Sequence, residues 1–153
     1  MSRQNWGALD CAMQYLGIKE VPGHKSNPAI LAMLQMDMKW PKDDATPWCS
    51  AFANWVAFNM GLERSKSLRA RSWLLVGKEE SLEGANANCV VIFKRGRGRQ
   101  PGPDVIKAPG HVAFFSHLQD DKVWVVGGNQ GDKVSIKAYP LTQVLGVRRL
   151  RRV

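Results

Sequence analysis

The sequence predicts an α+β domain in which N-terminal helices pack on a C-terminal antiparallel β-sheet. Apolar residues recur at helical spacing through the first half of the chain, up to residue 76. From residue 89 onward, short apolar runs rich in β-branched and aromatic residues alternate with turns. The chain has 153 residues, the size of one compact domain, so we expect a single domain over 1–153.

Two helices are predicted in the first 40 residues. The first ends near Gly17 and carries apolar residues at helical spacing, namely Trp6, Leu9, Met13 and Leu16. The following segment, KEVPGHKSNP, contains His24 and is interrupted by Pro and Gly, which predicts a loop. The second helix then begins with Asn27 as its N-cap and Pro28 in its first turn.

A third helix is predicted from Pro47 to Met60, and a short fourth helix from Leu68 to Val76. The third helix stops at Gly61, and its apolar face includes Cys49 together with Phe52, Ala53, Val56 and Met60.

Five strands are predicted in the second half of the chain, at 89–93, 111–118, 122–126, 133–139 and 146–150. The Asp120-Asp121 pair predicts a tight hairpin between the second and third of these strands. The segment KRGRGRQPGPD (94–104) is basic and rich in glycine, which predicts a loop.

Composition and charge narrow the classes of protein that the chain can belong to. Hydrophobic residues make up 44% of the chain, an ordinary globular value that argues against disorder. No apolar run reaches 18 residues, so no transmembrane segment is expected, and the N-terminus lacks the apolar core of a secretory signal. The net charge is +9, from 22 Lys and Arg against 13 Asp and Glu, which predicts an anionic partner such as nucleic acid, a membrane surface or cell wall.

The chain has three cysteines, too few and too scattered for a disulfide framework, and no spacing typical of a metal site, so no metal is expected. Cys49 lies at the predicted start of a helix, where the helix dipole and unpaired N–H groups favour the nucleophilic thiolate. The alternative is a buried cysteine that packs as a small hydrophobe. We interpret Cys11 and Cys89 in that second way.

A nucleophilic cysteine needs a base, and His111 is the candidate because it opens a predicted strand. His117 adjoins the hairpin turn and is interpreted as a surface histidine. Asn129 is the candidate to orient the imidazole, since the hairpin brings the end of the 122–126 strand back beside His111. Gln130 is the second candidate for that role. The alternatives are a strand histidine without a catalytic role and, for Gly-Gly-Asn-Gln, a plain turn.

Three segments taken together resemble the NlpC/P60 and CHAP group of papain-like cysteine peptidoglycan hydrolases. They are TPWCSAF (46–52), PGHVAFF (109–115) and GGNQ (127–130). The resemblance is greatest to the small phage endolysin-type branch, and it extends over most of the chain. It implies a papain-like NlpC/P60 fold and a single catalytic domain over 1–153 without a separate cell-wall-binding domain.

The resemblance also implies a reaction and a set of site residues. The chain is expected to be a cysteine peptidase or amidase that cleaves an amide bond of the peptidoglycan peptide stem through an acyl-enzyme. Either endopeptidase or N-acetylmuramoyl-L-alanine amidase chemistry fits. The implied catalytic residues are Cys49, His111 and Asn129, with Trp48, Ser50 and Gln130 as substrate-binding residues and no metal or organic cofactor. For Trp48, core packing is the open alternative.

The basic residues concentrate in the 94–99 loop and in the C-terminal tail VRRLRRV, apart in sequence from Cys49, His111 and Asn129. We expect them to assist docking to an anionic bacterial envelope by a monomeric enzyme whose partner is peptidoglycan. The alternatives are a basic nucleic-acid-binding module, although no specific nucleic-acid motif occurs, and a secreted antibacterial effector amidase with the same chemistry. Without a signal peptide, an endolysin is expected in the host bacterial cytoplasm until its release to the wall.

Overall fold

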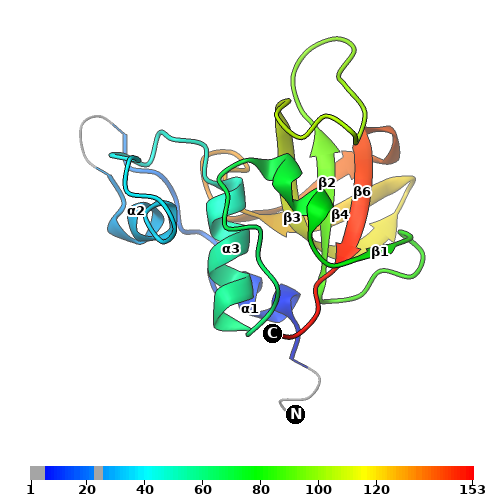
Figure 1. Cartoon of the computed structure of the whole chain (residues 1–153), viewed down its shortest axis with the longest axis horizontal. Coiled ribbons are helices and arrows are strands. Elements are labelled where there is room, and N and C mark those ends of the chain that lie inside the picture. The colour runs from blue at the N-terminus through cyan, green and yellow to red at the C-terminus, as the bar shows by residue number, and fades with distance from the viewer. Residues whose placement is uncertain (1–5, 23–25) are drawn as a thin grey trace.

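The computed structural model describes residues 6–22 and 26–153, and His24 lies outside the described residues. The α-helices come first and the strands follow, as predicted (Figure 1). The helical elements are α1 (Ala8–Met13), α2 (Pro28–Leu34), α3 (Cys49–Asn59) and the 3-10 helices η2 (Ala70–Leu75) and η3 (Leu141–Gln143). The strands are β1 (Lys78–Glu80), β2 (Cys89–Lys94), β3 (Gly110–Gln119), β4 (Lys122–Gly127), β5 (Ser135–Pro140) and β6 (Val144–Arg149).

The strands of the described residues form one antiparallel six-stranded sheet in the order β1-β6-β2-β3-β4-β5. The predicted hairpin between β3 and β4 is confirmed. Gln119 pairs with Lys122, and Asp120 and Asp121 both have positive φ, at 54° and 58°. This backbone matches the right-handed twist of the flanking strands. The sequence analysis missed β1, because its residues Lys-Glu-Glu contain no apolar side chain.

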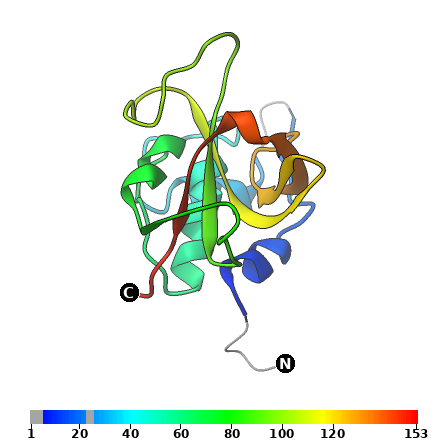
Figure 2. The same cartoon turned by 90° about the vertical axis from the view of Figure 1, so that its right-hand side faces the viewer.

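The sheet is apolar on both faces, which explains the uninterrupted apolar run of β2. Alternate residues of β2 and β3 enter two separate cores, because successive side chains of a strand point to opposite faces. One core contains Val90, Ile92, Val112 and Phe114 together with the helices. The other contains Val91, Phe93, Ala113 and Phe115 with residues of β4 and β6. No helix of the described residues contributes to the second core, which the curved sheet encloses together with Leu82 and Ala85 from the segment between β1 and β2 (Figure 2).

Helix α3 is the central helix of the domain, lying between α2 and the sheet (Figure 1). Eight of its eleven residues are buried, from Cys49 to Ala57. It begins at Cys49 instead of the predicted Pro47, with Trp48 as N-cap residue. The second helix begins as predicted: the Asn27 side chain accepts a hydrogen bond from the backbone N–H of Ala29 at 2.8 Å.

The C-terminal arginines are largely used within the fold. The Arg148 guanidinium donates to the Leu74 carbonyl at 3.0 Å. Two others form ion pairs, Arg149 with Glu80 at 3.5 Å and Arg151 with Glu63 at 2.9 Å. These contacts join the tail to η2, to β1 and to Glu63. Docking of the tail to an anionic envelope stays a prediction. Among the described residues, no helix is long and apolar enough to cross a bilayer.

Candidate active site

Cys49 is the first residue of α3, and its side chain reaches a cavity at the helix start. The residue is 4% exposed. It lines a cavity of about 320 Å³, here called the cysteine cavity, whose walls include Pro47, Leu68, Arg95, Pro109 and Gly110. Cys11 and Cys89 line no cavity described here; Cys11 is half-buried, Cys89 is buried, and both pack as expected against the cores.

Two opposing effects act on the Cys49 thiol. Burial raises its pKa, because a thiolate loses its hydration in the protein interior. Hydrogen bonding by the backbone N–H of Val112, the positive charge of Arg95 and the N–H groups of the helix start lower the pKa. Burial is the larger effect, so the sulfur keeps its proton in the free protein. From the position of Cys49 at a helix start, the sequence analysis had instead favoured the thiolate.

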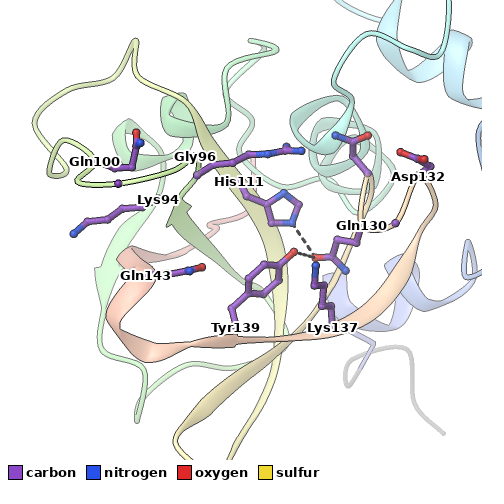
Figure 3. A pocket seen from close by; sticks show the side chains of 13 residues that line it. Lys94, Gly96, Gln100, His111, Gln130, Asp132, Lys137, Tyr139 and Gln143 are labelled. Atoms are coloured by element: carbon purple, nitrogen blue, oxygen red, sulfur yellow. Dashed lines mark hydrogen bonds between the residues drawn. The ribbon is translucent and has the colours of Figure 1, made fainter.

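His111 is the second residue of β3 and is 4% exposed. It lines a second cavity of about 420 Å³, the histidine cavity, together with Lys94, Arg95, Gln130, Lys137 and Tyr139 (Figure 3). Both chain neighbours of His111 lie at Cys49: Gly110 lines the cysteine cavity, and the Val112 N–H acts on the sulfur. The fold therefore brings together the predicted nucleophile and the predicted base.

A hydrogen-bond network fixes which nitrogen of His111 carries a proton. The Gln130 amide N–H donates to the Ser135 carbonyl at 2.8 Å, so Gln130 Oε1 is the atom that faces the ring. His111 Nε2 lies 2.9 Å from this oxygen, and Tyr139 donates its hydroxyl to the same oxygen at 3.3 Å (Figure 3). Because Oε1 can only accept, Nε2 carries the hydrogen in the neutral ring. Nδ1 is left with a free lone pair and can act as a base.

The orienting partner of His111 is thus Gln130, the second candidate from the sequence, and not Asn129. No hydrogen bond of the described residues joins Asn129 to the ring. Asn129 has a left-handed backbone, with φ of 61°, and its half-buried side chain lines the histidine cavity. This residue is the turn asparagine that the alternative interpretation described. The turn sends the next side chain, Gln130, inward, where it is 3% exposed.

The two glycines before Asn129 are in close contact with neighbouring side chains. A Cβ on Gly127 would lie 2.7 Å from Gln130 Oε1, and a Cβ on Gly128 would lie 2.7 Å from Cζ3 of Trp48. Such distances are shorter than carbon contacts in proteins, so side chains are excluded at both positions. The end of β4 can therefore pack directly against the start of α3.

The structure assigns different roles to three residues predicted to bind substrate. Trp48 is fully buried and donates its indole N–H to Glu20 at 3.2 Å. Ser50 is also fully buried, donates to the Ser67 carbonyl and accepts from the Trp73 indole at 2.9 Å. Both side chains lie outside the cysteine cavity's lining and belong to the core. Gln130 lines the cavity, but its amide is engaged by His111, Tyr139 and Ser135.

Two arginines at the site were missed from the sequence. Arg71 is fully buried in η2 and donates to three carbonyls of the loop before His111, those of Pro109, Gly102 and Val105, at 2.9, 2.7 and 3.1 Å. It thereby holds one wall of the cysteine cavity. Arg95, from the basic loop, lines both cavities. The loop therefore lies beside the site, whereas the sequence analysis had set its charges apart from Cys49, His111 and Asn129.

Burial also determines the charge of His111. It lowers the pKa of the imidazole to about 4, because the cation loses its hydration; the bond to Gln130 opposes this shift, and the charges of Arg95 and Lys137 add to it. The ring is therefore neutral at neutral pH and able to accept a proton. Within residues 6–22 and 26–153, no group of three or more His, Cys, Asp or Glu side chains is placed to hold a metal ion.

Comparisons with known proteins show the family and the fold of the chain. The family model described as "CHAP domain" matches residues 41–129, a range that includes Cys49 and His111. No curated protein matches the chain. Similar solved structures include NlpC1 from Trichomonas vaginalis and a protein described as similar to lipoprotein, NLP/P60 family, from Staphylococcus aureus subsp. aureus Mu50.

The first similar structure has a TM-score of 0.56 and 16% identity, and the match covers 95% of this chain and 44% of that one. The second has a TM-score of 0.55 and 18% identity, with 97% and 42% covered. The chain thus spans less than half the length of either structure. At these identities the likeness shows the fold, which is the predicted papain-like α+β fold of the NlpC/P60 proteins. Since the family model matches more than half of the chain, the chain belongs to the CHAP domain family, within the NlpC/P60–CHAP superfamily of cysteine peptidases.

Proposed function

We propose that this chain is a peptidoglycan hydrolase that cleaves an amide bond of the peptide stem through a cysteine acyl-enzyme. The observation that carries the proposal is the network Ser135–Gln130–His111, which leaves His111 Nδ1 free as a base beside the start of α3. Membership of the CHAP domain family supports peptidoglycan as the substrate class. In this proposal Cys49 is the nucleophile, His111 the general base and acid, and Gln130 the residue that orients the ring.

The chemistry starts from a neutral pair. At rest the thiol keeps its proton and the imidazole is uncharged, because burial disfavours the charged form of each. When an amide carbonyl enters the cleft, the proton moves from Cys49 Sγ to His111 Nδ1 and the sulfur attacks the carbonyl carbon. Backbone N–H groups at the start of α3 stabilise the negative oxygen of the tetrahedral intermediate.

The remaining steps return the enzyme to its starting state. The imidazolium gives its proton to the leaving amine, the carbon–nitrogen bond breaks, and a thioester to Cys49 remains. Water then gives a proton to Nδ1 while its oxygen attacks the thioester. The imidazolium returns this proton to the departing sulfur, which releases a carboxylic acid. Throughout, Gln130 Oε1 accepts the Nε2 hydrogen and keeps the ring in the productive orientation.

The proposal is tested on purified sacculi. Wild-type protein should clear them and release fragments whose masses identify the cut bond, which distinguishes a stem-peptide endopeptidase from an amidase. Cys49→Ala should abolish release while the protein still unfolds cooperatively. Cys11→Ala, which changes a half-buried cysteine away from the site, is the matched control and should keep activity. Fragment release by Cys49→Ala at the wild-type rate would contradict the mechanism.

We also propose an endolysin-type role, in which the enzyme degrades the wall of the cell that makes it. The exposed cations of the 95–99 part of the basic loop suit an anionic envelope. Expression in bacteria together with a membrane-permeabilising protein should cause lysis that Cys49→Ala does not cause. Binding of the protein to DNA without any effect on sacculi would instead favour a nucleic-acid-binding module.

A further inference from the structure

The histidine cavity contains charges that the proposed mechanism does not use. Three cations, Lys94, Arg95 and Lys137, line it, against one carboxylate, that of Asp132. The labelled side chains in Figure 3 come from several segments, with Lys94 at the end of β2 and Lys137 on β5. The cavity therefore carries a net positive charge beside the proposed base.

None of these three cations forms an ion pair among the described residues. The basic residues that do have carboxylate partners lie elsewhere, in the pairs Arg64–Asp37, Arg149–Glu80 and Arg151–Glu63. Long cationic side chains without a counter-ion are usual on an open surface, but here three of them line one concave site. The positive potential of the cavity therefore favours the binding of an anionic ligand.

Arg95 occupies the position between the two halves of the cleft, because it lines both the histidine cavity and the cysteine cavity. Its positive charge lowers the pKa of three groups of the site, Cys49, Tyr139 and His111. The ionised forms of Cys49 and Tyr139 and the neutral form of His111 are thereby favoured. An anion bound to Arg95 would therefore lie next to the reacting atoms.

The backbone next to Arg95 is constrained, and Lys137 contacts an aromatic ring. Gly96 and Gly98 have φ of 110° and 70°, values that side-chain-bearing residues rarely adopt, and the Gln100 amide donates to the Arg97 carbonyl at 2.7 Å. The loop after Arg95 is thus folded back on itself. Lys137 Nζ lies 5.2 Å from the centre of the Tyr139 ring, a cation–π contact to the residue that donates to Gln130.

We propose that the histidine cavity is a carboxylate subsite, in which Arg95 and Lys137 bind a free carboxylate of the peptide stem beside the scissile amide. This inference rests on the proposed function. Guanidinium groups bind carboxylates through two parallel hydrogen bonds, and an ammonium group adds a further charge-assisted bond. The bound carboxylate also offsets the positive potential that opposes protonation of His111, so it assists the step in which the ring takes the thiol proton.

The test compares two synthetic stem peptides with the same sequence. One has free carboxylates, and in the other these groups are carboxamides. Wild-type enzyme should cleave the carboxylate peptide with kcat/KM roughly tenfold higher or more, because a charged hydrogen bond is lost in the other. Arg95→Gln and Lys137→Gln should each reduce this preference. Arg97→Gln, which removes an exposed cation from the same loop outside both cavities, should leave it unchanged.

Equal cleavage of the two peptides by the wild type would overturn the subsite. So would equal losses on both peptides in Arg95→Gln, or the same loss of preference in Arg97→Gln. Calorimetric titration of the Cys49→Ala protein with each peptide separates this inference from the proposed function. If Cys49→Ala binds the carboxylate peptide more tightly than the carboxamide peptide, and Arg95→Gln removes this difference, the subsite is supported. This holds even if the wild-type protein cleaves neither peptide. Such a lack of cleavage would refute the proposed hydrolase function but not the subsite.

Discussion

The buried ring of His111 should make the stability of the protein depend on pH in a way that a single substitution removes. In the unfolded chain a histidine has a pKa near 6.5, whereas burial lowers the pKa of His111 to about 4. Between these values the unfolded chain binds a proton that the folded protein does not bind. The free energy of unfolding therefore rises with pH across this range.

The size of the effect follows from the two pKa values. The stabilisation is complete above pH 6.5 and is lost as the pH falls toward 4, at about 1.4 kcal/mol for each pH unit. The total is about 3 kcal/mol, because the ring is almost fully buried and solvent screens little of the effect. His111→Gln has no ring to protonate, so it should lose this part of the pH dependence. It also loses ring packing on Phe93 and Tyr139, a cost that is the same at every pH.

The assay is urea unfolding of wild type and His111→Gln from pH 7.5 to pH 4, with the difference in unfolding free energy plotted against pH. Other titrating groups are common to both proteins and cancel in the difference. We expect the difference to fall by about 3 kcal/mol toward pH 4. His117→Gln, which removes an exposed ring, is the matched control. A difference that stays constant within about 0.5 kcal/mol would refute the assignment of a buried neutral His111.

Three further substitutions test the parts of the site that hold His111. Gln130→Glu places a carboxylate where Oε1 lies 2.9 Å from the ring, so it should raise the pKa of His111. The acidic limb of the kcat/KM profile should then move to higher pH. Gln143→Glu, on the same cavity, is the control and should move this limb less. Arg71→Met leaves three loop carbonyls without their donor, so urea unfolding should show an unfolding free energy lower by about 3 kcal/mol or more. Arg69→Met, which changes an exposed arginine, is the control. Equal effects of the two substitutions would contradict the role of Arg71. Gly128→Ala forces a methyl group onto Trp48 and should destabilise the protein by about 1–3 kcal/mol by thermal unfolding, while Gly102→Ala, which meets no atom within 4 Å, should not.

Local patterns in the sequence were sufficient for the fold class and for most of the elements. The apolar run at 89–93 became β2, and the aspartate pair became the hairpin turn between β3 and β4. Both depend on information contained within a few residues, namely side-chain alternation and tolerance of positive φ. Strand β1 carries no such pattern, because it is a short charged edge strand that forms by pairing with β6.

The identity of the residue that orients His111 depended on the backbone of one turn. From the sequence, Asn129 and Gln130 were both candidates, because either lies at the end of the same strand. The left-handed conformation of Asn129 turns the chain so that Gln130 enters the interior, and the close packing of Gly127 and Gly128 fixes its depth. No spacing rule separates two adjacent residues whose directions depend on a single φ angle.

Local patterns predicted an α+β chain with Cys49 at a helix start and His111 at a strand start, and the motifs around them resemble the family to which the chain belongs. Three further features are visible only in the folded chain: Trp48 and Ser50 are core residues, Arg71 is buried among loop carbonyls, and Arg95 lines both cavities. The physical reason is that hydrophobic periodicity is a local property of the chain. The burial of a polar or charged group depends instead on distant partners, 31 to 38 residues away for Arg71 and 17 to 28 for Ser50 and Trp48. These partners come together only when the chain folds.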